Sequence, residues 1–127
     1  MNNIQKKVCK TAILLKDLPQ GKNRRFSFIT KRNTIVSNGW YKSFKTHPLS
    51  NKFGHRFNCI HSELDVINSF NYSIKELQNY SIYNVRVMKD GKIGYSKPCD
   101  ICQDLLVFFG LKKIYYSNWS KFNVFSC

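Results

Sequence analysis

The sequence predicts a single α/β domain in which helices pack against a five-stranded mixed sheet. The chain has 127 residues, which is enough for one hydrophobic core but not for two. Its composition, 43% hydrophobic and 15% aromatic, is that of a folded protein. Helical and strand-like patterns follow one another in the order α, β, β, α, β, α, β, β, and this alternation favours a sandwich of two or three layers. We therefore expect residues 1–127 to form one domain.

The first half of the chain is predicted to hold one helix and two strands. Apolar residues recur at helical spacing within residues 3–16, on a stripe formed by Ile4, Val8, Ala12 and Leu15. Residues 19–23 form a turn, and residues 25–39 are predicted as two strands around a tight turn at Lys31–Asn33. Residues 39–60 are expected to be a long irregular loop, and loops of this length in compact domains are usually functional or disordered.

The second half is predicted to alternate between helices and strands. A helix is expected over residues 62–70, with an extension through Leu77, and another over residues 99–109, where Gly110 is the stop signal. Strands are expected at residues 81–88, 112–117 and 121–127. Counted from the last residue of the second of these strands, only eleven residues remain, 117 to 127, whereas a parallel crossover needs about a dozen or more. The last two strands should therefore be antiparallel.

Positive charge is concentrated in the first half of the chain. The net charge is +14, and residues 1–58 contain 13 Lys or Arg and one acid, whereas residues 59–127 contain eight basic and six acidic residues. Excess positive charge attracts phosphate-bearing partners, so residues 1–58 are candidates for contact with nucleotides or nucleic acid. Compositional drift on a solvated surface is the alternative, but it explains poorly why the basic residues collect in one half.

The cysteines do not indicate a disulfide framework, because their number is odd and no secretory signal precedes them. They are Cys9, Cys59, Cys99, Cys102 and Cys127. The longest apolar run near the N-terminus, AILL, is far too short for a signal core or a bilayer span. We therefore expect an intracellular, cytoplasmic protein without a membrane partner.

Two short motifs together predict a metal site. In SKPCDIC, residues 96–102, Cys99 and Cys102 are one helical turn apart, and thiolates at a helix N-terminus are stabilised by the helix dipole. His61, at the start of the other helix, would complete three ligands of a zinc site with an open fourth position, which is typical of catalytic zinc. A closed structural site would need a fourth ligand, for which the candidates are Cys59, His55 and His47.

The two motifs, His61-Ser62-Glu63 and Pro98-Cys99-Asp100-Ile101-Cys102, follow the pattern H-x-E and P-C-x-x-C. In this the chain resembles the zinc-dependent cytidine and deoxycytidylate deaminase superfamily, in particular its small, phage-like members. The resemblance implies two helices side by side on one face of a five-stranded sheet. It also implies hydrolytic deamination, with Zn²⁺ as cofactor, Glu63 as the acid and base, and the backbone N–H of Ser62 helping to hold the base.

Residues that would bind the substrate are less clearly marked. Members of the superfamily usually carry an asparagine after the second strand, whereas here Tyr41 occupies that position and Asn38 lies three residues earlier. Aromatic side chains could stack on a base. The candidates are Trp40, Tyr41, Phe44, Tyr116 and Trp119. Each of them could equally be a core residue.

Three functions are open at this stage. We favour a deaminase of free cytidine-type nucleosides or nucleotides, including deoxycytidylate, because the chain is short and ends in a hairpin; such enzymes commonly complete their sites across subunits, so we expect a homo-oligomer. A deaminase acting on cytosine in single-stranded DNA or RNA, bound through residues 1–58, is favoured by the charge. Adenine is a less favoured base on the same motif. A non-catalytic basic binding module with a retained zinc site is disfavoured by the intact Glu63.

Overall fold

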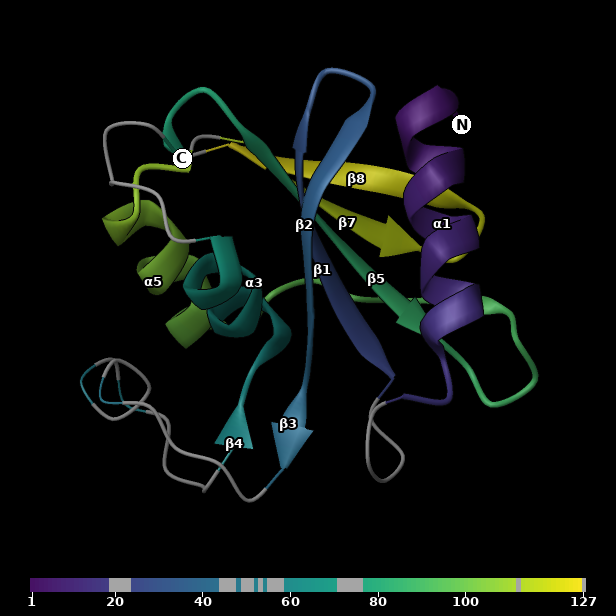
Figure 1. Cartoon of the computed structure of the whole chain (residues 1–127), viewed down its shortest axis with the longest axis horizontal. Coiled ribbons are helices and arrows are strands. Elements are labelled where there is room, and N and C mark those ends of the chain that lie inside the picture. The colour runs from purple at the N-terminus through teal and green to yellow at the C-terminus, as the bar shows by residue number, and fades with distance from the viewer. Residues whose placement is uncertain are drawn as a thin grey trace.

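A six-stranded sheet forms the centre of the protein, whose structure is a computed structural model (Figure 1). The structure describes residues 1–18, 24–43, 59–70, 77–111 and 113–126 and the single residues 48, 52 and 54, apart from the side chains of residues 43, 59 and 126. Five strands follow one another across the sheet in the order β2 (Thr34–Trp40), β1 (Arg25–Lys31), β5 (Ser81–Val87), β7 (Lys113–Asn118) and β8 (Lys121–Ser126). The sixth, β6 (Ile93–Gly94), pairs with β5.

The sheet is mixed, as the sequence predicts. β5 and β7 are parallel, while β1 pairs antiparallel with both β2 and β5. β7 and β8 form an antiparallel hairpin, which confirms the direction inferred from the short C-terminal segment. The predicted five-stranded sheet is confirmed, and β6 adds one short strand to it.

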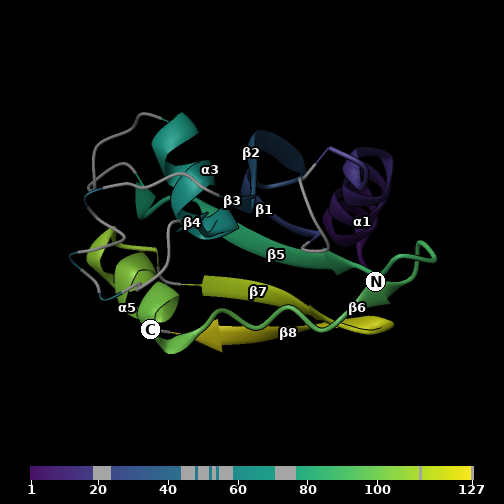
Figure 2. The same ribbon diagram turned by 90° about the horizontal axis from the view of Figure 1, so that it is seen from below.

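Helices cover both faces of the sheet, so the fold has three layers (Figures 1 and 2). Helix α1 (Asn3–Leu15) lies on one face, and helices α3 (Ser62–Phe70) and α5 (Asp100–Phe108) lie on the other. Side chains along a strand alternate between faces. Accordingly, Phe26 and Phe28 of β1 pack with the α1 cluster, and Ile29 packs with the cluster below α3 and α5. None of the described helices is long and apolar enough to cross a membrane.

The start of α3 is tied to β2 and β3 by a buried carboxylate. Asp65 is 5% exposed, and its Oδ2 accepts a hydrogen bond from the backbone N–H of Trp40 at 3.0 Å. The Lys42 ammonium donates to Asp65 Oδ1 at 2.7 Å. An acid that is buried must be paired, and here both oxygens have a donor. Asp65 therefore fixes the first turn of α3 relative to the sheet.

The predicted loop over residues 39–60 is partly wrong. β2 continues through Trp40, and the ends of the segment form a two-stranded sheet of β3 (Lys42–Ser43) and β4 (Cys59–Ile60). β2 can continue because Gly39 has no side chain: a Cβ there would lie 2.5 Å from the backbone nitrogen of Val66 in α3. The predicted helix over residues 62–70 agrees with α3, and most of its extension, residues 71–76, lies outside the described residues.

We expect Gly39→Ala to destabilise the fold by about 1–3 kcal/mol, because the added methyl group overlaps the backbone of α3. Gly94→Ala is the matched control, since its Cβ would meet the Sδ of Met88 at 2.8 Å, and a flexible thioether can move aside. The measurement is the free energy of unfolding in urea. Equal losses in the two variants would contradict the close approach of β2 to α3.

Candidate metal centre and active site

The N-termini of α3 and α5 bring one histidine and two cysteines together. The carbonyl of His61 accepts the hydrogen bond of the Asp65 N–H, so His61 stands just before the first turn of α3. Cys99 is the N-cap of α5, and its sulfur accepts from the backbone N–H of Cys102 at 3.4 Å. Cys102 is buried, Cys99 is exposed and His61 is half-buried, so the group lies at the edge of the core and opens to solvent.

The spacing of these side chains fits a tetrahedral metal ion. The Nδ1 of His61 lies 3.3 Å from the sulfur of Cys102 and 3.8 Å from that of Cys99, and all three atoms lie within 4.8 Å of one another. Ligands about 2.0–2.3 Å from a shared tetrahedral ion would be roughly 3.6 Å apart. The group could therefore hold a metal ion without rearrangement, and one nitrogen with two sulfurs is a donor set that suits zinc.

The close contacts within this group raise the pKa values of two of its side chains. The pKa of the Cys102 thiol is raised, first by its hydrogen bond with Cys99 and then by burial. The pKa of His61 is also raised, chiefly by a hydrogen bond with Cys99, although burial acts in the opposite direction. Metal binding needs neutral imidazole and thiolate, so it would release protons from these side chains.

Glu63 lies beside the metal-ligand group but is held by other residues. Its side chain is 5% exposed. One carboxylate oxygen accepts a hydrogen bond from the Ser62 hydroxyl at 3.0 Å, and the other accepts from the Asn84 amide at 3.0 Å. Ser27 closes a ring, because its hydroxyl oxygen lies 2.7 Å from both the Ser62 hydroxyl and Asn84 Oδ1.

The ring has one place for an extra proton. It consists of four contacts between Glu63, Ser62, Ser27 and Asn84. When Glu63 is ionised, the two hydroxyls and the amide provide only three hydrogens for these contacts, since an ionised carboxylate is an acceptor only. A proton on Glu63 would supply the fourth. The surroundings of Glu63 can therefore accommodate the carboxyl group with or without a proton.

A pocket lies over the metal-ligand group and Glu63. It is open to solvent, and its empty space is about 280 Å³ when the solvent at its mouth is included. Its lining residues are Arg25, Tyr41, His61, Ser62, Glu63 and Cys99. The rings of Tyr41 and His61 are 5.9 Å apart, so Tyr41 forms one wall beside the imidazole.

Two of the residues predicted to bind substrate, Ser62 and Tyr41, line this pocket. Asn38 and Trp40 do not, because they lie opposite Phe28 and Phe26 in the β1–β2 register and thus face α1. Trp40 packs against the core on that side. A strand sends only alternate residues to each face, so Gly39, between them, is the residue that faces α3.

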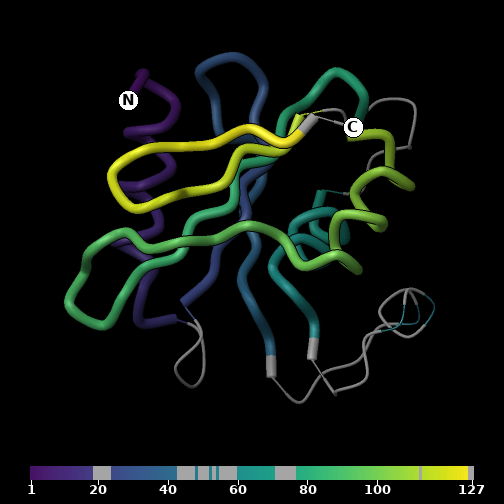
Figure 3. Tube along the Cα trace, turned by 180° about the vertical axis from the view of Figure 1, so that it is seen from behind, coloured from purple at the N-terminus to yellow at the C-terminus, as the bar shows by residue number. Residues whose placement is uncertain are grey.

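Tyr116 and Trp119 also lie away from the pocket lining. Tyr116 is 9% exposed and packs edge-to-face on Tyr95, although it lies beside Asn84 in the β5–β7 register. Trp119 is 57% exposed in the β7–β8 turn, on the opposite side of the molecule from α3 and α5 (Figures 1 and 3). Phe44 and the candidate fourth ligands His47, His55 and the Cys59 side chain lie outside the described part of the chain.

Three residues at the site were not foreseen from the sequence: Ser27, Asn84 and Arg25. Ser27 and Asn84 are polar residues at buried positions of apolar strands, each 4% exposed or less. A buried polar side chain needs a partner, so these positions carried a signal. Which partner they meet depends on the β1–β5 register, in which Ser27 lies opposite Asn84.

The fold is shared with a deaminase of known structure, as the two motifs predicted. That protein is the dCMP deaminase of the cyanophage S-TIM5. Its apo form aligns with a TM-score of 0.60 and 19% identity over 95% of this chain and 87% of that one. Its complex with dCMP and dUMP aligns with a TM-score of 0.61 and 18% identity over 93% of this chain and 83% of that one. No protein-family model and no curated protein matches the sequence.

We expect the protein to bind about one divalent metal ion per chain, and His61→Ala or Cys102→Ala to remove it. The measurement is the metal content after zinc loading, with the sulfur-to-cobalt absorption of a Co²⁺-substituted sample as a second readout. Cys9→Ala is the control: Cys9 is buried in α1, and burial raises the pKa of its thiol to about 11. Metal retained in Cys102→Ala would contradict the assignment.

Proposed function

We propose that the protein is a zinc-dependent hydrolytic deaminase that converts cytosine to uracil in a nucleoside or nucleotide, acting as a single domain. The observation that carries this proposal is that a buried carboxylate, Glu63, lines the same pocket as two members of a His-Cys-Cys group, His61 and Cys99. The donor set has three protein ligands, as catalytic zinc sites do. The shared fold with a dCMP deaminase supports the same activity.

When bound by His61, Cys99 and Cys102, zinc would supply a nucleophile by lowering the pKa of water toward neutrality. The water oxygen adds to C4 of cytosine, and the C4–N bond to the amino group then breaks. Water and cytosine are consumed, and uracil and ammonia are formed, so no oxidant or further reactant is needed.

Glu63 would move the protons of this reaction. Its carboxylate takes one proton from the water and delivers it to the ring nitrogen next to C4. It then takes the second proton of the added water, which leaves the C4 carbonyl, and passes that proton to the departing amine. The contacts described above support this role. The Asn84 amide holds one oxygen, and the Ser62–Ser27 pair adjoins the other. Glu63 can thus gain and lose a proton without leaving its place.

We expect Glu63→Gln to lower kcat by about 10²–10⁴-fold while the bound metal stays, because the amide cannot accept the proton. The measurement is ammonia release from dCMP and deoxycytidine by the zinc-loaded protein. Asp104→Asn is the control, since it removes an exposed acid from α5 without touching the pocket. Full activity in Glu63→Gln would rule out the proposed role.

Asn84→Leu should lower kcat by about 10–100-fold with a much smaller change in KM. It leaves one oxygen of Glu63 without its donor and the Ser27 hydroxyl without its acceptor. Asn118→Leu, at the end of β7, is the control within the same sheet. A rise in KM at constant kcat would instead mean that Asn84 only binds the substrate.

A second candidate is deamination of cytosine within single-stranded DNA or RNA. The net charge of +14 favours it, because binding to a phosphate backbone is driven by basic residues and weakens steeply with salt. The reaction and the residues that perform it would be the same. The two candidates differ only in what is attached to the base, and the experiment in the next section separates them.

A further inference from the structure

Two arginines stand side by side next to the proposed active site. Arg25 at the start of β1 and Arg86 near the end of β5 are opposite each other in the β1–β5 register. Opposite residues share a face, with their Cβ atoms about 4.5–5.5 Å apart. Ser27 and Asn84 are the next such pair on this face. The arginines therefore extend the polar row that reaches Glu63.

A third cation completes the cluster. Lys97, in the segment between β6 and α5, lines a second hollow together with Arg25. This hollow adjoins the pocket over the metal-ligand group, because Arg25, Ser62 and Glu63 line both. On the other side, Arg86 lines a third hollow with Arg24 and Lys89. Positive charge thus runs outward from the site along the ends of β1 and β5.

No acid compensates this cluster within the described part of the chain. No carboxylate there lies within salt-bridge distance of Arg25, Arg86 or Lys97; the two ion pairs found join Lys16 with Asp17 and Lys42 with Asp65. Glu63 lines the same pockets, but its two oxygens are already held by Ser62 and Asn84. Like charges directly opposite each other destabilise a sheet. Such a cluster is therefore suited to a bound anion.

We propose that Arg25, with Arg86 and Lys97, binds the 5′-phosphate of the substrate, so that the protein acts on a nucleotide rather than on a nucleoside. This inference rests on the proposed function. Arg25 lines the same pocket as His61 and Glu63, so an anion bound by Arg25 would lie next to a base held in that pocket. The planar guanidinium binds a phosphate through two parallel hydrogen bonds, which a point charge cannot do.

The test compares binding of dCMP, deoxycytidine and a single-stranded oligonucleotide with one cytosine. Titration calorimetry uses the zinc-loaded full chain carrying Glu63→Gln, so that turnover of the substrate during the titration is strongly reduced. Addition of Arg25→Gln should weaken dCMP binding by about 10- to 100-fold and deoxycytidine binding by less than about 3-fold. Arg25 is exposed, so the substitution leaves the core intact.

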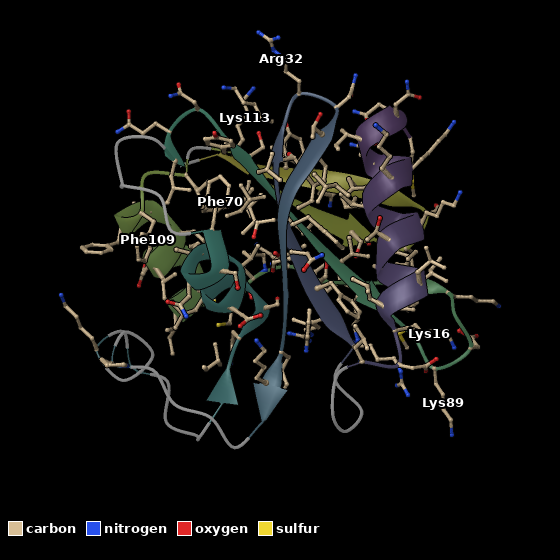
Figure 4. All side chains as sticks on the ribbon, in the orientation of Figure 1. Lys16, Arg32, Phe70, Lys89, Phe109 and Lys113 are labelled. Carbon is tan, nitrogen blue, oxygen red and sulfur yellow. The ribbon has the colours of Figure 1, made fainter. Side chains whose placement is uncertain are left out.

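Arg32→Gln is the matched control. Arg32 lies at the tip of the β1–β2 hairpin, roughly 20 Å along the strand from Arg25 (Figure 4). Arg32→Gln removes the same charge as Arg25→Gln, so a general electrostatic effect on binding would appear in both variants. We expect Arg32→Gln to leave the ratio of dCMP to deoxycytidine affinity unchanged.

Three results would overturn the proposal. Equal losses for dCMP and deoxycytidine would mean that Arg25 shapes the pocket rather than binding phosphate. No loss for dCMP would exclude the subsite. A loss for the oligonucleotide alone would assign the phosphate to a polynucleotide. Failure of the proposed function looks different: the protein without Glu63→Gln would release no ammonia from any substrate, whether or not dCMP binding depends on Arg25.

Discussion

A buried carboxylate that must find partners is the constraint on which the site depends. Glu63 and Asp65 are both 5% exposed in the first turn of α3, and an unpaired charge at such depth is costly. Asp65 binds the backbone of Trp40 and the Lys42 ammonium, which fixes α3 to the edge of the sheet. Glu63 then meets Asn84 from β5. The contacts of Asp65 with the sheet thus determine which residues surround Glu63.

The sheet face below α3 and α5 changes character along its strands. At one end Ile29, Ile82 and Ile114 pack into the core under the two helices. At the other end the same face carries Ser27 and Asn84, followed by Arg25 and Arg86. The N-termini of α3 and α5 lie where the apolar part ends, so the candidate metal ligands and Glu63 lie at a boundary between the hydrophobic core and the charged surface. Such a boundary gives firm positioning on one side and access for a polar ligand on the other.

Sequence patterns predicted the helices and strands, and the position of Cys99 and Cys102 at the start of a helix, because these depend on local signals. The Cys99–Cys102 spacing and the amphipathic stripe of α1 are complete within one or two helical turns. The substrate residues depend on which face of a strand a residue occupies. One step in register moves a side chain to the other face, and Trp40 was therefore placed at the site although it packs against the α1 core. The role of Asn84 likewise follows only from its alignment with Ser27.

The separation of the site residues along the chain has a consequence for how the protein folds. The hydrogen bonds between Glu63 and Asn84, His61 and Cys102, and Ser27 and Asn84 span 21, 41 and 57 residues. Contacts this distant form only after long loops have closed, and topologies rich in them fold slowly. A fragment that contains the whole ring together with the candidate metal ligands must span at least residues 27–102. The candidate site is thus complete only after β1, β5, α3 and α5 have come together.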